Sequence, residues 1–205
     1  DGMVVWTESV EVNNARVGIL QRMLAMHPLD CMNCGKLGAC KLQKYCEMYG
    51  VTEPVYKIPY EHREKDMSNR FYFQELDKCI RCGKCVRVCR ELVGVNALVM
   101  AQKGNMAYVM PNGGKNMAET ACVSCGNCVS VCPVGALMPK SQQFFRQWET
   151  QKVVTTCAYC GVGCQIEYSV RNGKIVDAKP ANGPSNQGLL CVQSQIGRAS
   201  CRERV

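Results

Sequence analysis

The sequence predicts a loop-rich α+β fold whose stability depends on its cysteines. Three observations predict it: 17 of the 205 residues are Cys, only 7% are aromatic, and short apolar segments alternate with cysteine runs. A chain of this length can form one or two domains with ordinary cores. The cysteine content is instead typical of folds that are cross-linked by disulfides or metals.

All cysteines except Cys46 and Cys201 fall into four closely spaced sets, the first of which includes a histidine. Disulfides would need an oxidising compartment, and cysteines three positions apart make poor partners. Structural zinc usually combines one C-x2-C pair with a distant second pair. Three cysteines within seven residues instead suit three corners of one [4Fe–4S] cluster. The sets are His27, Cys31, Cys34 and Cys40; Cys79, Cys82, Cys85 and Cys89; Cys122, Cys125, Cys128 and Cys132; and Cys157, Cys160, Cys164 and Cys191.

The second and third sets are two copies of one run, C-x2-C-x2-C-x3-C, and the later copy continues into Pro133. This spacing matches the bacterial ferredoxin run, in which the fourth cysteine of each copy binds the other cluster. We therefore predict that Cys132 completes the site of the first triplet and Cys89 that of the second. Each fourth cysteine is expected to begin a helix that leads away from its own triplet. Cys46 fits no second spacing, and we interpret it as a non-ligating thiol.

Local signals predict the remaining elements in chain order. Residues 1–12 are expected to be extended, and residues 47–70 a connector. Asn13 or Asn14 can cap a helix that Pro28 ends, and Asn172-Gly173 is a strong hairpin signal. The expected elements are a helix with Val17, Leu20 and Leu24 on one face; a hairpin of Ala97–Gln102 and Met106–Pro111; a helix capped by Ser141 with Phe144, Phe145 and Trp148; a strand at Val153–Thr155; a hairpin of Ile166–Val170 and Lys174–Ala178; and a loop at residues 180–188.

The formal net charge of +8 would suit nucleic acid or an acidic membrane surface. That charge counts every Cys as neutral, whereas metal-bound thiols are deprotonated. Four ligated clusters contribute roughly −7, which brings the chain without its last ten residues to about −1. We therefore expect no nucleic-acid partner and interpret the basic residues between the ligands as counter-charge. They are Lys36, Lys41, Lys78, Arg81, Lys84, Arg87 and Arg90.

The two ends of the chain resemble known modules. Asp1-Gly2-Met3-Val4-Val5, His27-Pro28-Leu29-Asp30-Cys31 and Cys40-Lys41-Leu42-Gln43 resemble an iron–sulfur module shared by the large subunit of NADH–quinone oxidoreductases, iron-only hydrogenases and NAD-dependent formate dehydrogenases. In that module His27, Cys31, Cys34 and Cys40 would bind one [4Fe–4S] cluster. Residues 153–192 resemble the N-terminal [4Fe–4S] domain of molybdopterin oxidoreductases.

The combination resembles the alpha subunit of a formate dehydrogenase, because both middle clusters keep all their cysteines and a molybdopterin-type module follows. The resemblance implies an electron relay of four [4Fe–4S] clusters, with a [2Fe–2S] cluster and a molybdenum or tungsten bis(pterin guanine dinucleotide) in the full-length protein. Catalytic residues would lie outside residues 1–205, and the partner would be a flavin and NAD-binding subunit or another electron-transfer subunit. The alternatives are the large iron–sulfur subunit of NADH–quinone oxidoreductase and a zinc-stapled binding module.

The expected organisation has three modules and a tail. No stretch approaches the ~18 apolar residues of a membrane-spanning helix, so we expect no span and a cytoplasmic protein. Residues 196–205 resemble the translation of a common sequencing-adapter oligonucleotide, and we expect a non-native tail on a fragment. The divisions are 1–60, the end of a [2Fe–2S] domain plus the His/Cys module; 61–145, a two-cluster ferredoxin-like domain; 146–195, a truncated molybdopterin oxidoreductase [4Fe–4S] domain; and 196–205, the tail.

Overall fold

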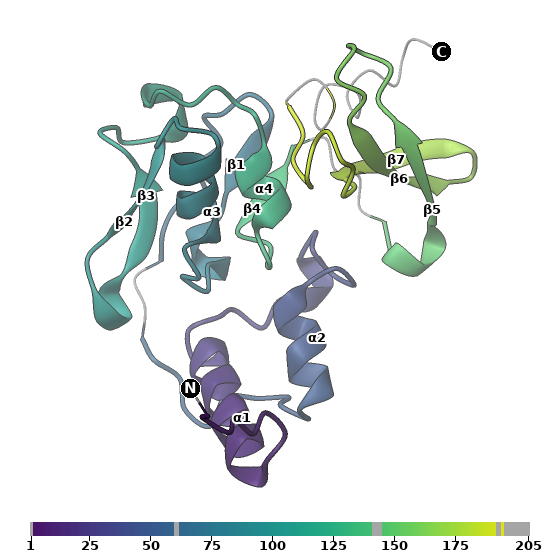
Figure 1. Cartoon of the computed structure of the whole chain (residues 1–205). Coiled ribbons are helices and arrows are strands. Elements are labelled where there is room, and N and C mark those ends of the chain that lie inside the picture. Colours follow the sequence, from purple (N-terminus) through teal and green to yellow (C-terminus); the bar gives the residue numbers. More distant parts are fainter. Residues whose placement is uncertain (1, 60–61, 141–144, 192–193, 195–205) are drawn as a thin grey trace.

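The computed structural model describes residues 2–59, 62–140, 145–191 and 194 (Figure 1). Helices and strands are short, and loops connect them over most of the chain, as the sequence predicts. In chain order the elements are α1 (Val10–Leu24), η1 (Cys31–Asn33), α2 (Lys41–Met48), β1 (Tyr72–Gln74), η2 (Leu76–Lys78), α3 (Lys84–Arg87), the π-helix η3 (Val88–Leu92), β2 (Leu98–Ala101), η4 (Gly104–Met106), β3 (Tyr108–Pro111), η5 (Met117–Glu119), α4 (Asn127–Val131), β4 (Leu137–Pro139), η6 (Gln147–Glu149), β5 (Gln151–Thr156), β6 (Gln165–Arg171) and β7 (Lys174–Pro180).

These elements form three groups (Figure 1). Helices α1 and α2 lie at one end of the molecule. Helices α3 and α4 lie in the middle group with the antiparallel pairs β1–β4 and β2–β3. Strands β5, β6 and β7 form a three-stranded antiparallel sheet. The loop that follows β7, drawn in yellow, lies between α4 and this sheet.

Helix α1 begins earlier than the sequence predicts. Ser9 is its N-cap, and the Ser9 hydroxyl accepts a hydrogen bond of 3.3 Å from the N–H of Val12. The prediction that Asn13 or Asn14 caps the helix is wrong, because both lie inside it and Ser9 already satisfies a free N–H at its start. The prediction of extended structure for residues 1–12 fails at residue 10 for the same reason. The helix ends at Leu24, ahead of Pro28.

The first and the last strand of the middle group, β1 and β4, pair with each other. Strand β1 pairs antiparallel with β4, so that Tyr72 lies opposite Pro139 and Gln74 opposite Leu137. Helices α3 and α4, which lie between β1 and β4 in the sequence, contact each other. The pairing therefore brings the start of the first cysteine run next to the residues that follow the second.

Both predicted hairpins are confirmed. Strands β2 and β3 pair antiparallel across a turn that contains η4. Strands β6 and β7 pair across Asn172 and Gly173, whose φ angles are 50° and 73°. Positive φ at both central residues is the geometry of the tight turn that Asn-Gly favours. The predicted strand at Val153–Thr155 lies within β5.

The helix predicted after Ser141 is wrong over the residues that the structure describes. Residues 141–144 lie outside them, and Phe145 and Arg146 lie in neither a helix nor a strand. Only the single 3₁₀ turn η6 follows before β5. Phe145 is buried whereas Trp148 is exposed. The two aromatic side chains therefore do not lie on one buried helical face.

The buried residues form two cores. One extends from Leu20 on α1 and Leu42 on α2 to Val134 and Leu137 near β4, so the first two groups share it. The other contains Ile166 and Tyr168 of β6 and is confined to the last group. The boundary predicted between residues 60 and 61 falls on a pair outside the described residues.

Candidate metal centres

Thiols from both cysteine runs surround one cavity in the middle group. Cys79, Cys82, Cys85 and Cys132 line this cavity. The remaining wall is mainly apolar, and Cys89 is not part of it. The structure therefore places the fourth cysteine of the later run beside the first triplet, in the crossed arrangement that the spacing predicts.

A second cavity is lined by the complementary set. Its thiols are Cys89, Cys122, Cys125 and Cys128. Cys132 does not line it. The two cavities thus exchange their fourth cysteines, and that each holds a cluster remains a prediction.

Backbone geometry at the start of each run is the same. Arg81 and Ser124 both have left-handed backbone, with φ of 60° and 55°. As a result the Arg81 N–H donates to Cys79 Sγ at 3.4 Å, and the Ser124 N–H donates to Cys122 Sγ at 3.3 Å. These backbone donors point at the sulfur atoms that would carry negative charge as ligands.

Helices α3 and α4 each begin directly after a glycine with positive φ, Gly83 at 69° and Gly126 at 76°. The prediction that the fourth cysteine begins a helix is wrong. Cys89 lies inside the π-helix η3, and Cys132 follows the last residue of α4. The third cysteine of each run lies in the first turn instead, because the glycine starts the helix before it.

Two polar side chains of β1 and its preceding loop also reach the second cavity. The Tyr72 hydroxyl lies 3.1 Å from Cys122 Sγ, and Tyr72 is only 1% exposed. Asn69 donates through Nδ2 to Ser124 Oγ at 3.0 Å and lies 3.9 Å from Cys122 Sγ. Burial raises the pKa of Tyr72 far above its ordinary value, so its hydroxyl keeps the proton it can donate. Neither residue belongs to a spacing motif, so no signal in the sequence could have found them.

The first predicted set also gathers around a cavity, which His27, Cys31, Cys34 and Cys40 line. His27 Nδ1 is buried and has no hydrogen-bond partner among the described residues. Burial, with the positive charge of Lys78 as a second cause, lowers the pKa of His27. A neutral imidazole with an unsatisfied nitrogen, on a residue that lines a cavity with three thiols, has the properties that a metal ligand needs.

A short loop after Cys132 separates this cavity from the first thiol cavity. Gly135 lines the histidine cavity, and a Cβ there would lie 2.6 Å from Cys34 Sγ. Two residues earlier, the carbonyl of Pro133 accepts a hydrogen bond of 2.9 Å from the N–H of Lys41. The absence of a side chain at Gly135 therefore lets the two sites approach closely.

The fourth set gathers at one end of the three-stranded sheet. Cys157 directly follows β5, and its N–H donates to the Cys164 carbonyl at 2.7 Å. The hydroxyl of Ser194 lies 3.2 Å from Cys157 Sγ and 3.6 Å from Cys191 Sγ. Burial, together with the nearby thiols of Cys160, Cys157 and Cys191, raises the pKa of Cys164.

The donor sets fit a [4Fe–4S] cluster in their chemistry. Burial raises the pKa of Cys85 to about 12 and that of Cys79 to about 11, with neighbouring thiols contributing. Four thiolates in one buried cavity need a compensating positive charge, which an iron–sulfur core supplies. Within the described ranges, no disulfide joins cysteines, and no three His, Cys, Asp or Glu side chains meet the geometry for a single metal ion.

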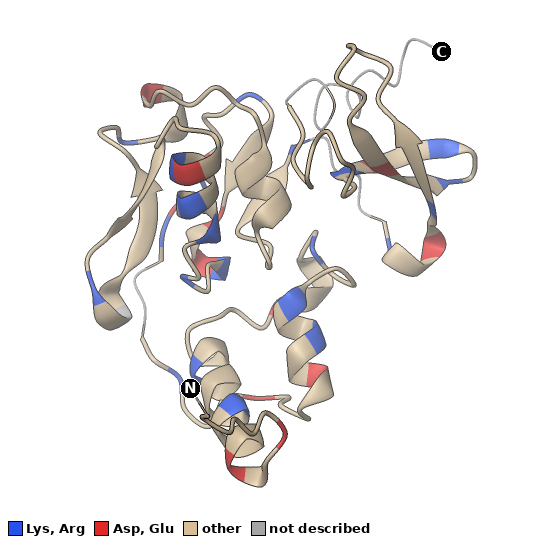
Figure 2. Cartoon of the chain, in the orientation of Figure 1, with Lys and Arg blue, Asp and Glu red and all other residues tan. Residues whose placement is uncertain are grey.

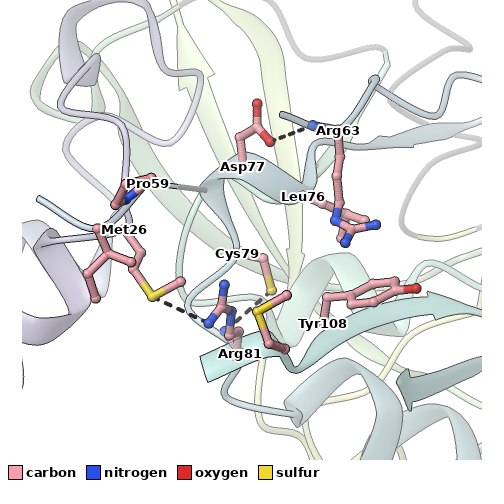
Figure 3. Close-up of a pocket in the computed structure, with 10 residues that line it drawn as sticks. Met26, Pro59, Arg63, Leu76, Asp77, Cys79, Arg81 and Tyr108 are labelled. Carbon is pink, nitrogen blue, oxygen red and sulfur yellow. Dashed lines mark hydrogen bonds between the residues drawn. The ribbon is translucent and has the colours of Figure 1, made fainter. Parts of the chain in front are cut away.

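A separate cleft opens beside Cys79 (Figure 3). The guanidinium of Arg63 lies 3.8 Å from the centroid of the Tyr108 ring. Arg81 donates through Nη1 to Met26 Sδ at 3.3 Å. These two arginines place positive charge in the cleft that Cys79 also lines.

Cys46, the cysteine interpreted as non-ligating, is buried in α2 and is absent from the linings of all three cavities. In the part of the chain that the structure describes, no helix has both the length and the apolar character required to cross a membrane.

Three family models match successive parts of the chain. Residues 16–54 match the NADH-ubiquinone oxidoreductase-G iron-sulfur binding region. Residues 78–136 match the 4Fe-4S dicluster domain. Residues 150–202 match the molybdopterin oxidoreductase Fe4S4 domain, a match that extends into the segment 196–205 predicted to be non-native.

Curated relatives match nearly the whole chain. The alpha subunit of a NADPH-Fe(3+) oxidoreductase from Geobacter sulfurreducens is 34% identical over 96% of this chain and 23% of its own length. A subunit of an NADH-quinone oxidoreductase from Rhizobium meliloti is 36% identical over 96% of this chain and 23% of its own length. Among solved structures, an NAD+-reducing [NiFe]-hydrogenase in the H2-reduced state is similar, with a TM-score of 0.62 and 28% identity over 67% of this chain and 58% of that chain. The chain therefore spans about a quarter of the length of the curated relatives it matches.

Proposed function

This chain carries the N-terminal iron–sulfur region of the NADH–quinone oxidoreductase-G and molybdopterin oxidoreductase family, and from that premise we propose that it relays electrons through four [4Fe–4S] clusters. Bound clusters would supply one-electron redox chemistry. The residues of this chain would supply the sulfur and nitrogen ligands and donate hydrogen bonds to the sulfurs. The observation that carries the proposal is the exchange of fourth cysteines between two thiol-lined cavities.

Four ligand sets would hold the clusters. Three of them line cavities, and in the fourth set Cys157 and Cys191 both lie near the Ser194 hydroxyl. The matches to three iron–sulfur domain families support the same assignment. The proposed ligands are His27, Cys31, Cys34 and Cys40; Cys79, Cys82, Cys85 and Cys132; Cys89, Cys122, Cys125 and Cys128; and Cys157, Cys160, Cys164 and Cys191.

The whole protein would be an iron–sulfur subunit of an NAD(P)-linked oxidoreductase complex with a flavin-containing partner. Relatives named as NADPH and NADH oxidoreductase subunits support this partner class. Our first candidate reaction is formate oxidation at a molybdenum or tungsten pterin centre, with a [2Fe–2S] cluster also present. The match to a molybdopterin oxidoreductase domain and the full set of eight middle cysteines support it.

The second candidate is the large subunit of an NADH–quinone oxidoreductase. The 36% identity to the NADH-quinone oxidoreductase subunit from Rhizobium meliloti favours it. In that case the full-length protein would only pass electrons from the NADH side toward quinone. Stopped-flow reduction of the full-length complex separates the candidates: bleaching by formate supports the first, and bleaching by NADH alone, with no response to formate, supports the second.

Anaerobic reconstitution with iron and sulfide tests the relay itself. We expect about sixteen iron atoms per chain, a brown protein, and loss of visible absorbance on reduction by dithionite. The competing zinc-stapled module would instead return a colourless protein with about one zinc per set. That result would overturn the proposed function.

A further inference from the structure

One basic residue lies where two of the proposed sites meet. Basic residues occur in all three groups of elements (Figure 2), so a positive charge alone indicates no special role. Of the basic residues interpreted as counter-charge, only Lys78 is among the described residues that line the three thiol-lined cavities. Lys78 lines the cavity of His27 and directly precedes Cys79, a proposed ligand of the neighbouring site.

The Lys78 side chain is largely buried and is held by an ion pair. Lys78 Nζ lies 2.8 Å from Glu75 Oε1, and the two side chains are only 12% and 19% exposed. The single turn η2 brings them together: the Lys78 N–H donates to the Glu75 carbonyl at 3.2 Å. Side chains three residues apart on such a turn lie one above the other. Because a buried charge needs a partner, the pair fixes the position of the ammonium group.

The loop after Cys132 holds this pair against the His27 cavity. The Glu75 N–H donates to the carbonyl of Ala136 in that loop at 2.8 Å. One residue earlier, a Cβ on Gly135 would lie 2.6 Å from Cys34 Sγ and 3.5 Å from Lys78 Cδ. The Lys78 stem and the Cys34 sulfur therefore flank the same point, which the missing side chain of Gly135 leaves open.

The neighbouring charges leave Lys78 as the main field at this cavity. Lys65 Nζ lies 3.0 Å from the other Glu75 oxygen, so two lysines share one carboxylate and a net positive charge remains. Asp30 also lines the cavity, but it is exposed, and its carboxylate accepts a hydrogen bond of 2.7 Å from Asn33 Nδ2. Water and salt screen an exposed charge far more than a buried one.

We propose that Lys78, positioned by Glu75, sets the reduction potential of the cluster at His27. A reduced cluster carries one more negative charge than an oxidised one. A fixed positive charge at the cavity wall therefore stabilises the reduced form and raises the potential. The proposal rests on the proposed function, because it needs a cluster at the His27 set.

Four variants of the full chain test this role. Lys78→Met removes the positive charge and keeps most of the stem. Glu75→Gln removes the negative charge and keeps an oxygen that can accept a hydrogen bond from Lys78. Lys65→Met is the matched control, because Lys65 pairs with the same carboxylate but does not line the cavity. His27→Cys changes one proposed ligand and so identifies the signal of this cluster. Iron content is measured first: a wild-type chain that binds no iron would refute the proposed function itself.

Redox titration followed by electron paramagnetic resonance then measures the potential of the identified cluster. We expect Lys78→Met to lower it, by about tenfold in the equilibrium constant for reduction, and Glu75→Gln to raise it. Lys65→Met should shift it less than Lys78→Met does. A role in packing alone would not produce shifts of opposite sign in the two members of one ion pair.

Iron-loaded variants decide against the proposal in three ways. An unchanged potential in Lys78→Met, shifts of the same sign in Lys78→Met and Glu75→Gln, or an equal shift in Lys65→Met would each overturn it. If Lys78→Met loses the iron of this site, Glu75→Gln decides, and a potential that is unchanged or lowered there would overturn the proposal. Loss of that iron in both variants would show that the pair holds the cluster and does not set its potential, which would overturn it as well.

Discussion

Single buried side chains distinguish the two thiol cavities. The second cavity receives the Tyr72 hydroxyl at 3.1 Å from Cys122 Sγ, whereas no tyrosine among the described residues lines the first. When Cys122 is a thiolate, the hydroxyl is the donor in this pair. Donors to sulfur stabilise the reduced, more negative cluster. The second site should therefore be more readily reduced than its thiol set alone would make it.

Replacing Tyr72 by Phe tests the effect of this single hydroxyl group on the reduction potential. We expect Tyr72→Phe to retain the iron of the chain and to lower the potential of one cluster only, because the ring keeps its packing and only the hydroxyl is lost. Redox titration followed by electron paramagnetic resonance measures the shift. Tyr108→Phe, on β3 beside the first cavity, is the control and should leave that potential unchanged. Equal potentials in the wild type and Tyr72→Phe would show that the hydroxyl does not act on the cluster.

Gly135 should be intolerant of any side chain. A Cβ there would lie 2.6 Å from Cys34 Sγ, a separation that forces the sulfur or the loop to move. We expect Gly135→Ala to lose the cluster at His27, measured as a fall of about four iron atoms per chain. Gly18→Ala is the matched control, because Gly18 lies in α1 with nothing within 4 Å of the added Cβ. That control should keep all its iron and stabilise α1 by up to about 1 kcal/mol, and a full iron complement in Gly135→Ala would contradict the prediction.

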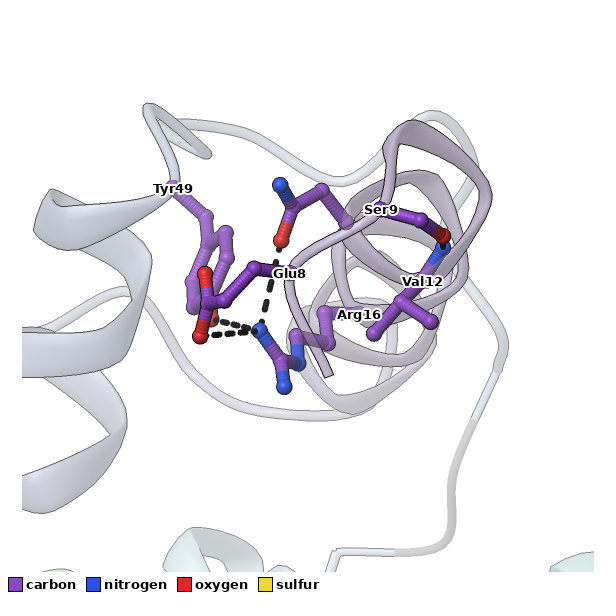
Figure 4. Close-up of polar contacts among 6 residues, drawn as sticks. Glu8, Ser9, Val12, Arg16 and Tyr49 are labelled. Atoms are coloured by element: carbon purple, nitrogen blue, oxygen red, sulfur yellow. Dashed lines mark hydrogen bonds and ion pairs between the residues drawn. The ribbon is translucent and has the colours of Figure 1, made fainter. Parts of the chain in front are cut away.

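Helices α1 and α2 position the histidine site, because proposed ligands lie just beyond the end of α1 and just before the start of α2. Figure 4 shows Arg16 on α1 directed toward Tyr49, which follows α2. Arg16 Nη1 donates to the Tyr49 hydroxyl at 3.0 Å and to Asn13 Oδ1 at 3.3 Å. His27 follows α1, and Cys40 precedes α2. The contact between the helices therefore helps to hold two proposed ligands of the same cluster in place.

The N-cap of α1 gives a prediction for the stability of the whole helix. We expect Ser9→Ala to destabilise α1 by about 1 kcal/mol, because a helix N–H loses its acceptor. Hydrogen–deuterium exchange of residues 10–16 should be faster, while the iron content stays unchanged. Ser9→Asp keeps an acceptor and should restore protection. If Ser9→Ala exchanged like the wild type, the Ser9 hydroxyl would contribute nothing to the stability of the start of α1.

At the scale of the molecule, the spacing of cysteines predicts which thiols share a cavity, because three ligands within seven residues are close by local geometry alone. The two hairpins are predicted for the same local reason. The polar groups at the second cavity are not predicted: Tyr72 arrives there through the pairing of β1 with β4, and Asn69, which lies near Cys122, belongs to no spacing motif. The helix after Ser141 is predicted wrongly because aromatic residues spaced like one helical face lie instead in different environments.

The crossing of the fourth cysteines ties the two halves of the middle group together, and it gives the last prediction. Because Cys132 lines the cavity of the first triplet, Cys132→Ala should damage the cluster at Cys79, Cys82 and Cys85. Because Cys89 lines the other cavity, Cys89→Ala should damage the cluster at Cys122. Tyr72→Phe identifies the signal of the Cys122 site, so each damaged cluster can be assigned by spectroscopy in the double variants. If Cys132→Ala altered the signal that Tyr72→Phe shifts and spared the other, each run would close its own cluster, and the β1–β4 pairing would be a consequence of packing rather than of shared ligation.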